Sequence, residues 1–543
     1  MKKQSTLKRA LALGMSATMV SATLAGCGGS ASSTAATSTE TASSAATEAE
    51  ATTDSDKPFA GTTLTWYTTL NGNVSDNFAN LGDTPWAKYV EEQTGITIEF
   101  QHPTQGSEAE EFAVMLASGE YPDIIEYTWT TYSGGAGAAI NDGVIISLDD
   151  YMADATNLSK VMQEHPEIGK MIKSSGGNYY CFPCLRGLES PNKTEFSSGF
   201  LYRADALKEL GFDQVPETID EWEEVLRAAK AAGYSKPFTT RKEWVKDVWS
   251  AAYDNWGSFY VDDGVVKNGL IEDSRKDFIQ KMADWYAKGY IDPDFLTLDN
   301  SGLDGKMTGD ICVATYRSPD SGIGVWTKNM QATNPDVVFC AAKFPVLNEG
   351  DTRYFGAMNL RYQAAYSAAI TTSCKDVEAA LKLLDYAYSE EGRLLYNFGV
   401  EGISFEYDEN GTPQFTDLIR NNPDGLSLKE AMILWCRNSA GGPFEKDAGP
   451  ILAQRVDNQY QYDAPFFWDA SIDWSKNLPR MVYSGEENSA LNDIDTILEE
   501  MTVKIIIGDQ SADAYDDYVA TMKEAGIEEA IEIVQTAYDR MSK

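Results

Sequence analysis

In the first part of the folded chain, segments whose hydrophobic residues have the spacing of a strand alternate with segments that have the spacing of a helix. The stretch GTTLTWYTTL, which follows Phe59, predicts a strand rich in threonine, leucine and aromatic residues. PWAKYVEEQTG predicts a helix ending at Gly95, TIEFQ a second strand, EAEEFAVMLASGE a second helix, and DIIEY a buried third strand. This strand–helix–strand–helix–strand order is typical of an α/β fold.

Two amphipathic helices stand out in the middle of the chain. TIDEWEEVLRAAKAAG places its apolar residues on one face, begins with a capping box of Thr218 and Glu221, and ends at Gly233. DFIQKMADWYAKG repeats the same pattern. We therefore predict that Trp222 and Trp285 are core residues.

Further elements follow in the second half. GDICVATYR and AAYSAAITT predict strands, KDVEAALKLLDYAYSEEGRLLYNFG predicts a long helix and a shorter one, and FEYDENGTPQF predicts a hairpin with an Asn-Gly turn. The C-terminal third is predicted to be helical. Because 543 residues exceed the usual size of one compact core, we expect at least two lobes.

The N-terminus has the layout of a secretory signal. Basic residues precede the apolar stretch ALALGMSATMVSATLAG, which is too short and too rich in alanine for a stable membrane span. Leu24 to Cys27 match a bacterial lipobox, which predicts a lipoprotein signal peptide over 1–26 and lipidation of Cys27, for example by palmitate. The alternative is a plain signal peptide with a chance cysteine.

The segment after the lipobox predicts a tether. From 28 to 56 it has no aromatic residue and no Leu, Ile, Val or Met, so it cannot bury a core. As a flexible coil it would span on the order of 30 Å. We therefore assign 27–57 to lipidated Cys27 and a disordered tether that holds the folded part near a membrane.

The charge balance excludes one class of partner. The formal net charge is −39, from 44 basic and 83 acidic residues, and removal of 1–26 takes away four basic residues and leaves 40 − 83 = −43. A chain this acidic, without a basic patch, repels nucleic acid.

The sequence carries no catalytic or metal-binding motif that we recognise. It has no GxSxG, Walker or placed GxGxxG motif, and its two histidines, His102 and His165, cannot form a His-rich metal site. We predict that both histidines are solvated surface residues and that the protein is not an enzyme and holds no cofactor or metal. Carboxylate pairs for glycoside hydrolysis stay open, because their spacing exists only in three dimensions.

The CFPC stretch is the only close pair of cysteines. We expect Cys181 in a strand and Cys184 in a loop. A local disulfide or metal site stays open, although no second CxxC completes a zinc site.

Several stretches together resemble a known family. These are LASGEYPDII with LDDYM, LYRADALKELGFDQVPETIDEWEEVLRAAKAAG, DWYAKGYIDPDF, GKMTGDICVATY, EEGRLLYNFGVEG and the closing MTVKIIIGDQSADAYDDYVATMKEAGIEEAIEIVQTAYDR. In this order, over 59–543, they resemble family 1 of the extracellular solute-binding proteins of carbohydrate ABC importers, specifically the LplA-like, aldouronate-type lipoproteins.

The resemblance implies a two-lobed fold of the type II periplasmic-binding-protein kind, with a ligand cleft between hinged lobes and a helical C-terminal third. We place lobe 1 at 58–183 plus 360–405 and lobe 2 at 184–359 plus 406–543. The resemblance also implies an oligosaccharide ligand, closure of the lobes, and docking of the closed form on ABC permease subunits.

Candidate ligand-binding residues of lobe 1 follow predicted strands, where clefts of open α/β sheets lie. Strand alternation puts Trp66 and Tyr67 on opposite faces, so one is core, and we choose Tyr67 for the cleft. Asn71 lies in the loop after it. The third strand leads to Tyr127 and Trp129, and to Tyr132, which could equally pack the turn.

The other candidates come from lobe 2 and the crossing segments. Trp244 is either a ligand contact or part of a core stripe, and Tyr316 and Arg317 end the ICVATYR strand. Arg186 and Arg361 lie near the crossings and could pair with a uronic acid, or form interlobe or surface salt bridges. The last candidate is Trp468, with a packed loop as the alternative.

The resulting hypothesis is a lipid-anchored, monomeric substrate-binding subunit of an ABC transporter on the extracellular face of the membrane of a Gram-positive bacterium. Its ligand is an oligosaccharide, with or without a uronic acid. Two alternatives stay open: a surface enzyme acting on glycans, and a glycan-binding sensor or adhesion module without transport.

Overall fold

The computed structural model describes most of the chain after the tether. The described residues are 57–70, 74, 78–188, 198–254, 258–355, 362–455, 458–479, 481, 483, 487, 490–491 and 502–542. The predicted signal peptide and nearly all of the predicted tether lie outside these residues.

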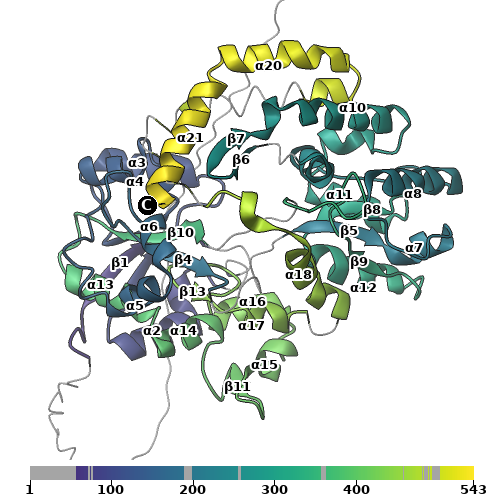
Figure 1. Cartoon of the computed structure of the whole chain (residues 1–543). Coiled ribbons are helices and arrows are strands. Elements are labelled where there is room, and N and C mark those ends of the chain that lie inside the picture. Colours follow the sequence, from purple (N-terminus) through teal and green to yellow (C-terminus); the bar gives the residue numbers. More distant parts are fainter. Residues whose placement is uncertain are drawn as a thin grey trace, which may run out of the picture. The chain divides into compact units, whose positions relative to one another are not determined.

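A six-stranded mixed sheet organises the first part of the fold. The strand order is β13-β4-β10-β3-β1-β2, with β1 parallel to β2 and β3, and β10 antiparallel to its neighbours β3 and β4. Figure 1 shows β4, β10 and β13 beside one another. The strands are β1 (Thr63–Tyr67), β2 (Thr97–Gln101), β3 (Ile124–Tyr127), β4 (Phe182–Arg186), β10 (Tyr362–Ile370) and β13 (Glu445–Lys446).

Amphipathic helices share a hydrophobic core with this sheet. The first of them begins after Thr84, whose hydroxyl accepts from the Ala87 amide, and ends at Gly95, which adopts φ 74°. Trp86, Ile124 and Leu383 are among the fully buried core residues. The helices are α2 (Pro85–Thr94), α3 (Glu108–Ser118), α4 (Gly135–Asn141), α5 (Thr156–Glu164), α6 (Pro166–Met171), α13 (Val377–Tyr386) and α14 (Glu390–Asn397).

A second core forms around an antiparallel sheet of order β8-β5-β9. The strands are β5 (Gly199–Arg203), β8 (Ala314–Arg317) and β9 (Phe339–Ala341). Associated elements are α7 (Ala204–Glu209), α8 (Ile219–Ala232), α9 (Val245–Ser250), the hairpin β6 (Phe259–Asp262) and β7 (Val265–Asn268), α10 (Asp273–Ala287), α11 (Asn300–Thr308), α12 (Val325–Gln331), α18 (Gln459–Ser471), α20 (Tyr515–Glu524) and α21 (Ile527–Ser542).

A third, smaller core is formed by a segment of the second half of the chain. It contains Phe398, Phe405, Phe415 and Met432. Its elements are the hairpin β11 (Phe405–Tyr407) and β12 (Pro413–Phe415), then α15 (Asp417–Arg420), α16 (Leu428–Trp435) and α17 (Gly449–Ala453). The predicted lobe boundaries stay a prediction.

The local predictions are largely confirmed. Thr218 and Glu221 form both bonds of the capping box of α8, and Trp222 and Trp285 are fully buried. The strands predicted from ICVATYR and AAYSAAITT are β8 and β10, and the predicted Asn-Gly hairpin is β11–β12. The α/β fold class is confirmed.

Two local predictions are wrong. The two cysteines of CFPC are placed the other way round: Cys184 lies within β4 and not in a loop, and Cys181 lies just before β4 and not in a strand. No disulfide joins the cysteines of the described chain. His102 is half-buried and fixed, because its Nδ1 donates to the Thr68 carbonyl at 2.8 Å and its Nε2 accepts from the Leu81 amide at 3.1 Å. Burial lowers the pKa of His102.

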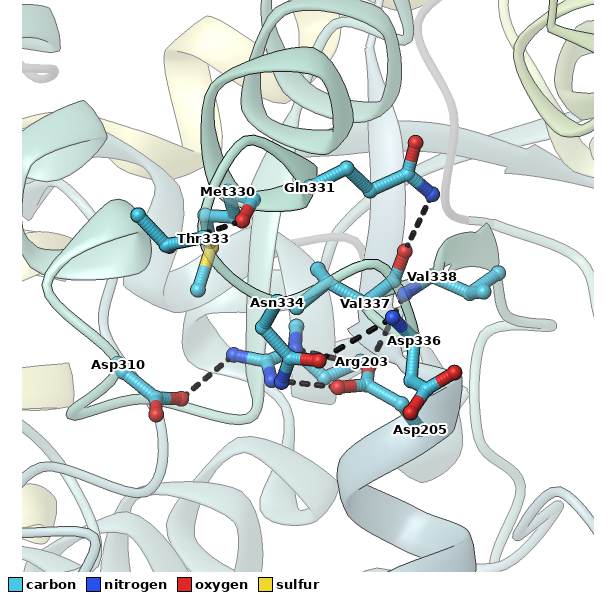
Figure 2. Close-up of polar contacts among 10 residues, drawn as sticks. All are labelled: Arg203, Asp205, Asp310, Met330, Gln331, Thr333, Asn334, Asp336, Val337 and Val338. Atoms are coloured by element: carbon cyan, nitrogen blue, oxygen red, sulfur yellow. Dashed lines mark hydrogen bonds and ion pairs between the residues drawn. The ribbon is translucent and has the colours of Figure 1, made fainter.

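Arg203 shows how this fold accommodates a buried cation. Its guanidinium at the end of β5 donates from Nε and Nη2 to Asp205, and from Nη1 to Asp310 at 2.7 Å (Figure 2). Asp205 also accepts from the Val338 amide, which ties the start of α7 to the segment before β9. These bonds raise the pKa of Arg203 although burial opposes them.

Candidate functional site

Polar side chains from neighbouring strands share one face of the six-stranded sheet. Lys446 of β13 pairs with Arg186 of β4, and Glu126 of β3 pairs with Ala368 of β10. Tyr366 stands two residues before Ala368 in β10 and lines the same pocket as Glu126. Thr68 follows β1 and hydrogen-bonds to the Glu126 carboxylate. We call these five residues, Thr68, Glu126, Tyr366, Arg186 and Lys446, the polar row.

Glu126 lies between Tyr366 and Thr68 in the polar row and faces an arginine. The Arg437 guanidinium donates from Nη2 to both Glu126 oxygens, at 3.5 and 3.4 Å, and from Nε to the Gly441 carbonyl at 2.8 Å. The same guanidinium lies 5.1 Å from the centre of the Trp86 ring. Burial raises the pKa of Glu126 although Arg437 opposes the shift.

Gly441 holds the backbone against the Tyr366 ring. Its φ is 94°, and a Cβ built there would lie 2.8–2.9 Å from three Tyr366 ring carbons. Only glycine adopts this φ without strain and also allows the close approach. The loop between α16 and β13 therefore fixes both Arg437 and Tyr366.

A pocket opens where the polar row meets this loop. Its volume is about 120 Å³. Its lining combines the Glu126–Arg437 pair and threonine hydroxyls with the Tyr366 ring and aliphatic side chains. The lining residues are Thr68, Thr69, Leu70, Val74, Leu81, Glu126, Tyr366, Ile433, Arg437 and Ala440. His102 holds the Thr68 carbonyl and the Leu81 amide in place behind this pocket.

Lys446 closes the polar row at its β13 end. Its side chain is 8 % exposed, and its ammonium lies 6.0 Å from the centre of the Tyr366 ring. Burial, together with the charges of Arg186 and Arg437, lowers the pKa of Lys446 to about 8, while nearby thiols oppose the shift.

The predicted residues of lobe 1 meet in an aromatic cluster. The Tyr127 ring stacks on Phe112 at 3.9 Å, and Trp129 meets Phe112 and Tyr127 edge-on at 6.3 and 5.6 Å. Tyr67 lies 6.5 Å from Phe112. Tyr132 lies 6.4 Å from Trp129 and donates its hydroxyl to Asp142.

Burial divides this cluster. Trp129 is 1 % exposed and belongs to the core, so the structure gives it no open face on which a sugar ring could stack. Tyr67 is also buried, whereas Tyr127 and Tyr132 are only partly covered. Ligand contact by these residues stays a prediction, and the geometry favours packing for Trp129.

The predicted residues of lobe 2 form another group. Trp244 lies 5.5 Å from Tyr316, which is buried, and the Arg241 guanidinium lies 4.7 Å over the Trp244 ring. Arg317 is held by Asp304 through Nε and Nη2 at 3.1 and 3.0 Å. Arg317 thus has its ion pair inside its own core, which is the alternative to a ligand role.

The remaining predicted residues have separate positions. Arg186 is in the polar row. Trp468 is fully buried in α18, donates to the Ala342 carbonyl at 3.1 Å, and packs so closely on Gly199 that a Cβ there would lie 2.3 Å from its ring. Asn71, Arg361 and Cys27 lie outside the described residues.

Arg437, Lys446 and Tyr366 were missed by sequence reasoning. The available signal was local: in RNSAGGPFEK, two cations flank a glycine pair and a proline within a short stretch. That pattern marks a tight loop between charged residues, but it does not say which strand the loop joins.

No helix among the described residues is long and apolar enough to cross a membrane. No group of three or more His, Cys, Asp or Glu side chains in that part of the chain is arranged to hold a metal ion.

Comparisons with known proteins give a consistent result. A family model described as "Bacterial extracellular solute-binding protein" matches residues 71–394. The chain is 23 % identical over 481 residues to lipoprotein LipO of Bacillus subtilis, covering 84 % of this chain and 89 % of LipO. It is 23 % identical over 492 residues to the fructooligosaccharide ABC transporter substrate-binding protein FusA of Streptococcus pneumoniae, covering 83 % of this chain and 86 % of FusA.

A solved structure shares the fold. An HMO-binding, ABC-transporter-associated solute-binding protein from Bifidobacterium longum infantis superposes with a TM-score of 0.70 at 17 % identity. The match covers 89 % of this chain and 99 % of that structure. At this identity the likeness shows the fold alone.

Proposed function

The chain belongs to the bacterial extracellular solute-binding proteins, and we propose that it captures an oligosaccharide for an ABC transporter. Members of this family bind solutes and are not enzymes, so the polar groups of the site serve recognition and not catalysis. FusA, whose match covers most of the chain at 23 % identity, is a substrate-binding protein for fructooligosaccharides.

The pocket beside the polar row supports the proposal best. A sugar presents hydroxyls around an apolar C–H face, so its site needs fixed donors and acceptors next to an aromatic or aliphatic surface. Glu126, Arg437 and the Thr68 hydroxyl supply the polar partners, and Tyr366 supplies a ring. Both β1 and β3 deliver these groups at their carboxyl ends, where open α/β sheets bind ligands.

We propose the finer assignments on other grounds. Lipidation of Cys27, extracellular anchoring to a Gram-positive membrane, a monomeric state and delivery to permease subunits are supported by the lipobox, the tether and the likeness to lipoprotein LipO. A uronic acid in the ligand is supported by the positive charge of the polar row at its Arg186–Lys446 end. The residues that remain proposed contacts are Tyr67, Asn71, Tyr127, Tyr132, Trp244, Tyr316 and Arg361.

A binding screen tests this function. Isothermal titration and thermal melting of the purified protein would use neutral fructooligosaccharides and galactooligosaccharides, acidic oligogalacturonates, and peptides as the contrasting class. We expect micromolar or tighter binding to a saccharide and none to peptides. Binding of peptides alone would overturn the proposal.

Thr68→Val makes the screen site-specific. The substitution keeps the shape of the side chain and removes the hydroxyl that bonds Glu126, so saccharide affinity should fall about tenfold. Thr521→Val, at an exposed threonine of α20, is the matched control and should leave affinity unchanged. Equal affinities for all three proteins would place the ligand elsewhere.

A further inference from the structure

Lys446 is a buried cation without a counter-ion in the described structure. It is more than nine-tenths buried, and within the part of the chain that the structure describes its ammonium makes no hydrogen bond and no ion pair. Its neighbours include the Tyr366 ring and two further cations, Arg186 and Arg437. An unpaired ammonium in such surroundings is unfavourable unless something else supplies the anion.

Four other buried or largely buried cations of the described residues have carboxylate partners. Arg203 has two carboxylates (Figure 2), Arg317 has Asp304, and Arg455 has Asp320 at 2.6 and 2.9 Å. Lys306, which is largely buried, lies between Asp292 and Asp294 at 2.8 and 2.5 Å. The fold therefore has the acidic residues to neutralise buried cations, and Lys446 departs from that pattern.

The charge around Lys446 is positive although the whole protein is strongly acidic. Lys446, Arg186 and Arg437 contribute three positive charges. Glu126 is already bonded to Arg437 and Thr68, and Asp320, whose negative charge interacts with Arg186, is already bonded to Arg455. Neighbouring Glu445 alternates to the other face of β13, where Arg393 lies 3.7 Å away. Lys446 therefore has no carboxylate partner of its own among the described residues, although the chain has a net charge of −39.

We propose that Lys446 is the specificity-determining residue that receives a carboxylate of an acidic sugar, with Arg186 beside it. This inference rests on the proposed function and adds the residue that selects an acidic ligand. The Tyr366 ring lines the saccharide pocket on the Arg437 side and lies under the Lys446 ammonium. A sugar bound against this ring thus presents its acidic group to Lys446 while its hydroxyls meet Glu126 and Arg437.

The melting temperature of the ligand-free protein tests whether the Lys446 charge is uncompensated. Lys446→Met keeps the length and volume of the side chain and removes an uncompensated buried charge, so it should raise the melting temperature without ligand. Lys306→Met is the matched control. It leaves Asp292 and Asp294 without their partner, so it should lower the melting temperature.

The binding arms use trigalacturonate as the acidic probe and a neutral trisaccharide of similar size. Lys446→Met should lose at least about tenfold affinity for trigalacturonate and keep its affinity for the neutral sugar within about twofold. Inorganic phosphate and sulfate form a third arm, which separates carboxylate recognition from general attraction of anions.

Each outcome decides between named possibilities. A stabilised Lys446→Met protein that has lost only acidic-sugar binding supports the inference. Neutral sugars bound by the wild type without any acidic sugar would overturn the inference and leave the proposed function standing. No saccharide bound at all would overturn the function itself.

A destabilised Lys446→Met protein with unchanged binding would make Lys446 structural, and tighter binding of phosphate than of trigalacturonate would also overturn the inference.

Discussion

At the scale of single residues, the protonation of Lys446 depends on the charged and titratable groups of all the segments packed around it. Burial lowers its pKa from 10.5 to about 8. The charged or titratable groups facing it are Cys184 and Arg186 of β4, Cys436 and Arg437 after α16, Glu126 of β3 and Tyr366 of β10. A carboxylate placed beside the ammonium would raise this pKa again.

Binding of an acidic sugar should therefore take up a proton above pH 8. Below pH 7 Lys446 is already charged, and affinity should be constant. Above pH 8 the free protein loses the charge that the complex keeps, so affinity should fall by up to about tenfold per pH unit. Titration calorimetry at about pH 6.5, 7.5, 8.5 and 9.5 measures this. A flat profile in the wild type, equal to that of Lys446→Met, would contradict the assignment.

His102 gives the protein a sensitivity to acid. Its folded-state pKa is lowered below 6.5 by burial, so the unfolded state binds more protons near pH 6. The stability that depends on neutral His102 is present above pH 6.5 and is lost as the pH falls through the lowered pKa. Urea unfolding at about pH 7.5 and 5.5 should show a smaller difference for His102→Gln than for the wild type. His165→Gln should behave like the wild type.

At the scale of elements, Trp129 is part of a one-turn helix, Trp129–Thr131, packed against the first core. Trp129→Ala should cost about 3–5 kcal/mol of unfolding free energy, since it removes a large buried ring from between Phe112, Tyr127 and Tyr132. Chemical denaturation measures the loss. If Trp129→Ala had normal stability but no longer bound saccharide, Trp129 would be a ligand contact and not a core residue.

The loop before β13 can be tested through its glycines. Gly441→Ala should destabilise the protein by about 2–4 kcal/mol, because strain at φ 94° adds to the clash with Tyr366. Gly402→Ala shares a positive φ of 75° but meets no atom within 4 Å, so it should cost only about 1 kcal/mol. Urea unfolding of both variants measures the two losses. If Gly441→Ala and Gly402→Ala lost the same free energy of unfolding, the clash with Tyr366 would contribute nothing to the cost.

Elements were easier to predict from sequence than the site, for a physical reason. The strands β1 to β3 and the helices α8 and α10 carry their periodicity within a few residues, and the capping box of α8 is local as well. The polar row joins Thr68, Glu126, Tyr366 and Lys446, which are up to 378 positions apart (446 − 68 = 378), through strand pairing that no local pattern encodes. The strand β13 has two residues, too few for any period.

Burial also bears on the candidate ligand contacts, whose role stays a prediction. Tyr67, Trp129, Tyr316 and Trp468 are aromatic residues at strand ends or in late segments, where sequence alone favours contact with ligand. Packing covers all four, because large rings at these positions fill the space between sheet and helix. Arg317 shows the same effect for a charge, since its partner Asp304 comes from the neighbouring α11.

At the scale of the whole molecule, family membership and the lipobox together make a prediction about location. Cys27→Ser removes the proposed lipidation site and should release the protein from the membrane fraction of the producing cells into the medium. Immunoblots of both fractions measure this. Ser30→Ala, at a serine three positions further along, is the control and should leave the protein on the membrane. Retention of the Cys27→Ser protein on the membrane would contradict the anchor.

The Arg437–Trp86 contact has a practical consequence for studying the protein. Trp86 is fully buried under a guanidinium whose carboxylate partner, Glu126, lines the proposed saccharide pocket. A ligand that moves the Arg437 guanidinium away from the Trp86 ring changes the electric field at the indole. The wavelength of the Trp86 fluorescence maximum should then shift. The fluorescence of Trp86 should therefore report ligand binding without an added label, and Trp86→Phe should remove this signal.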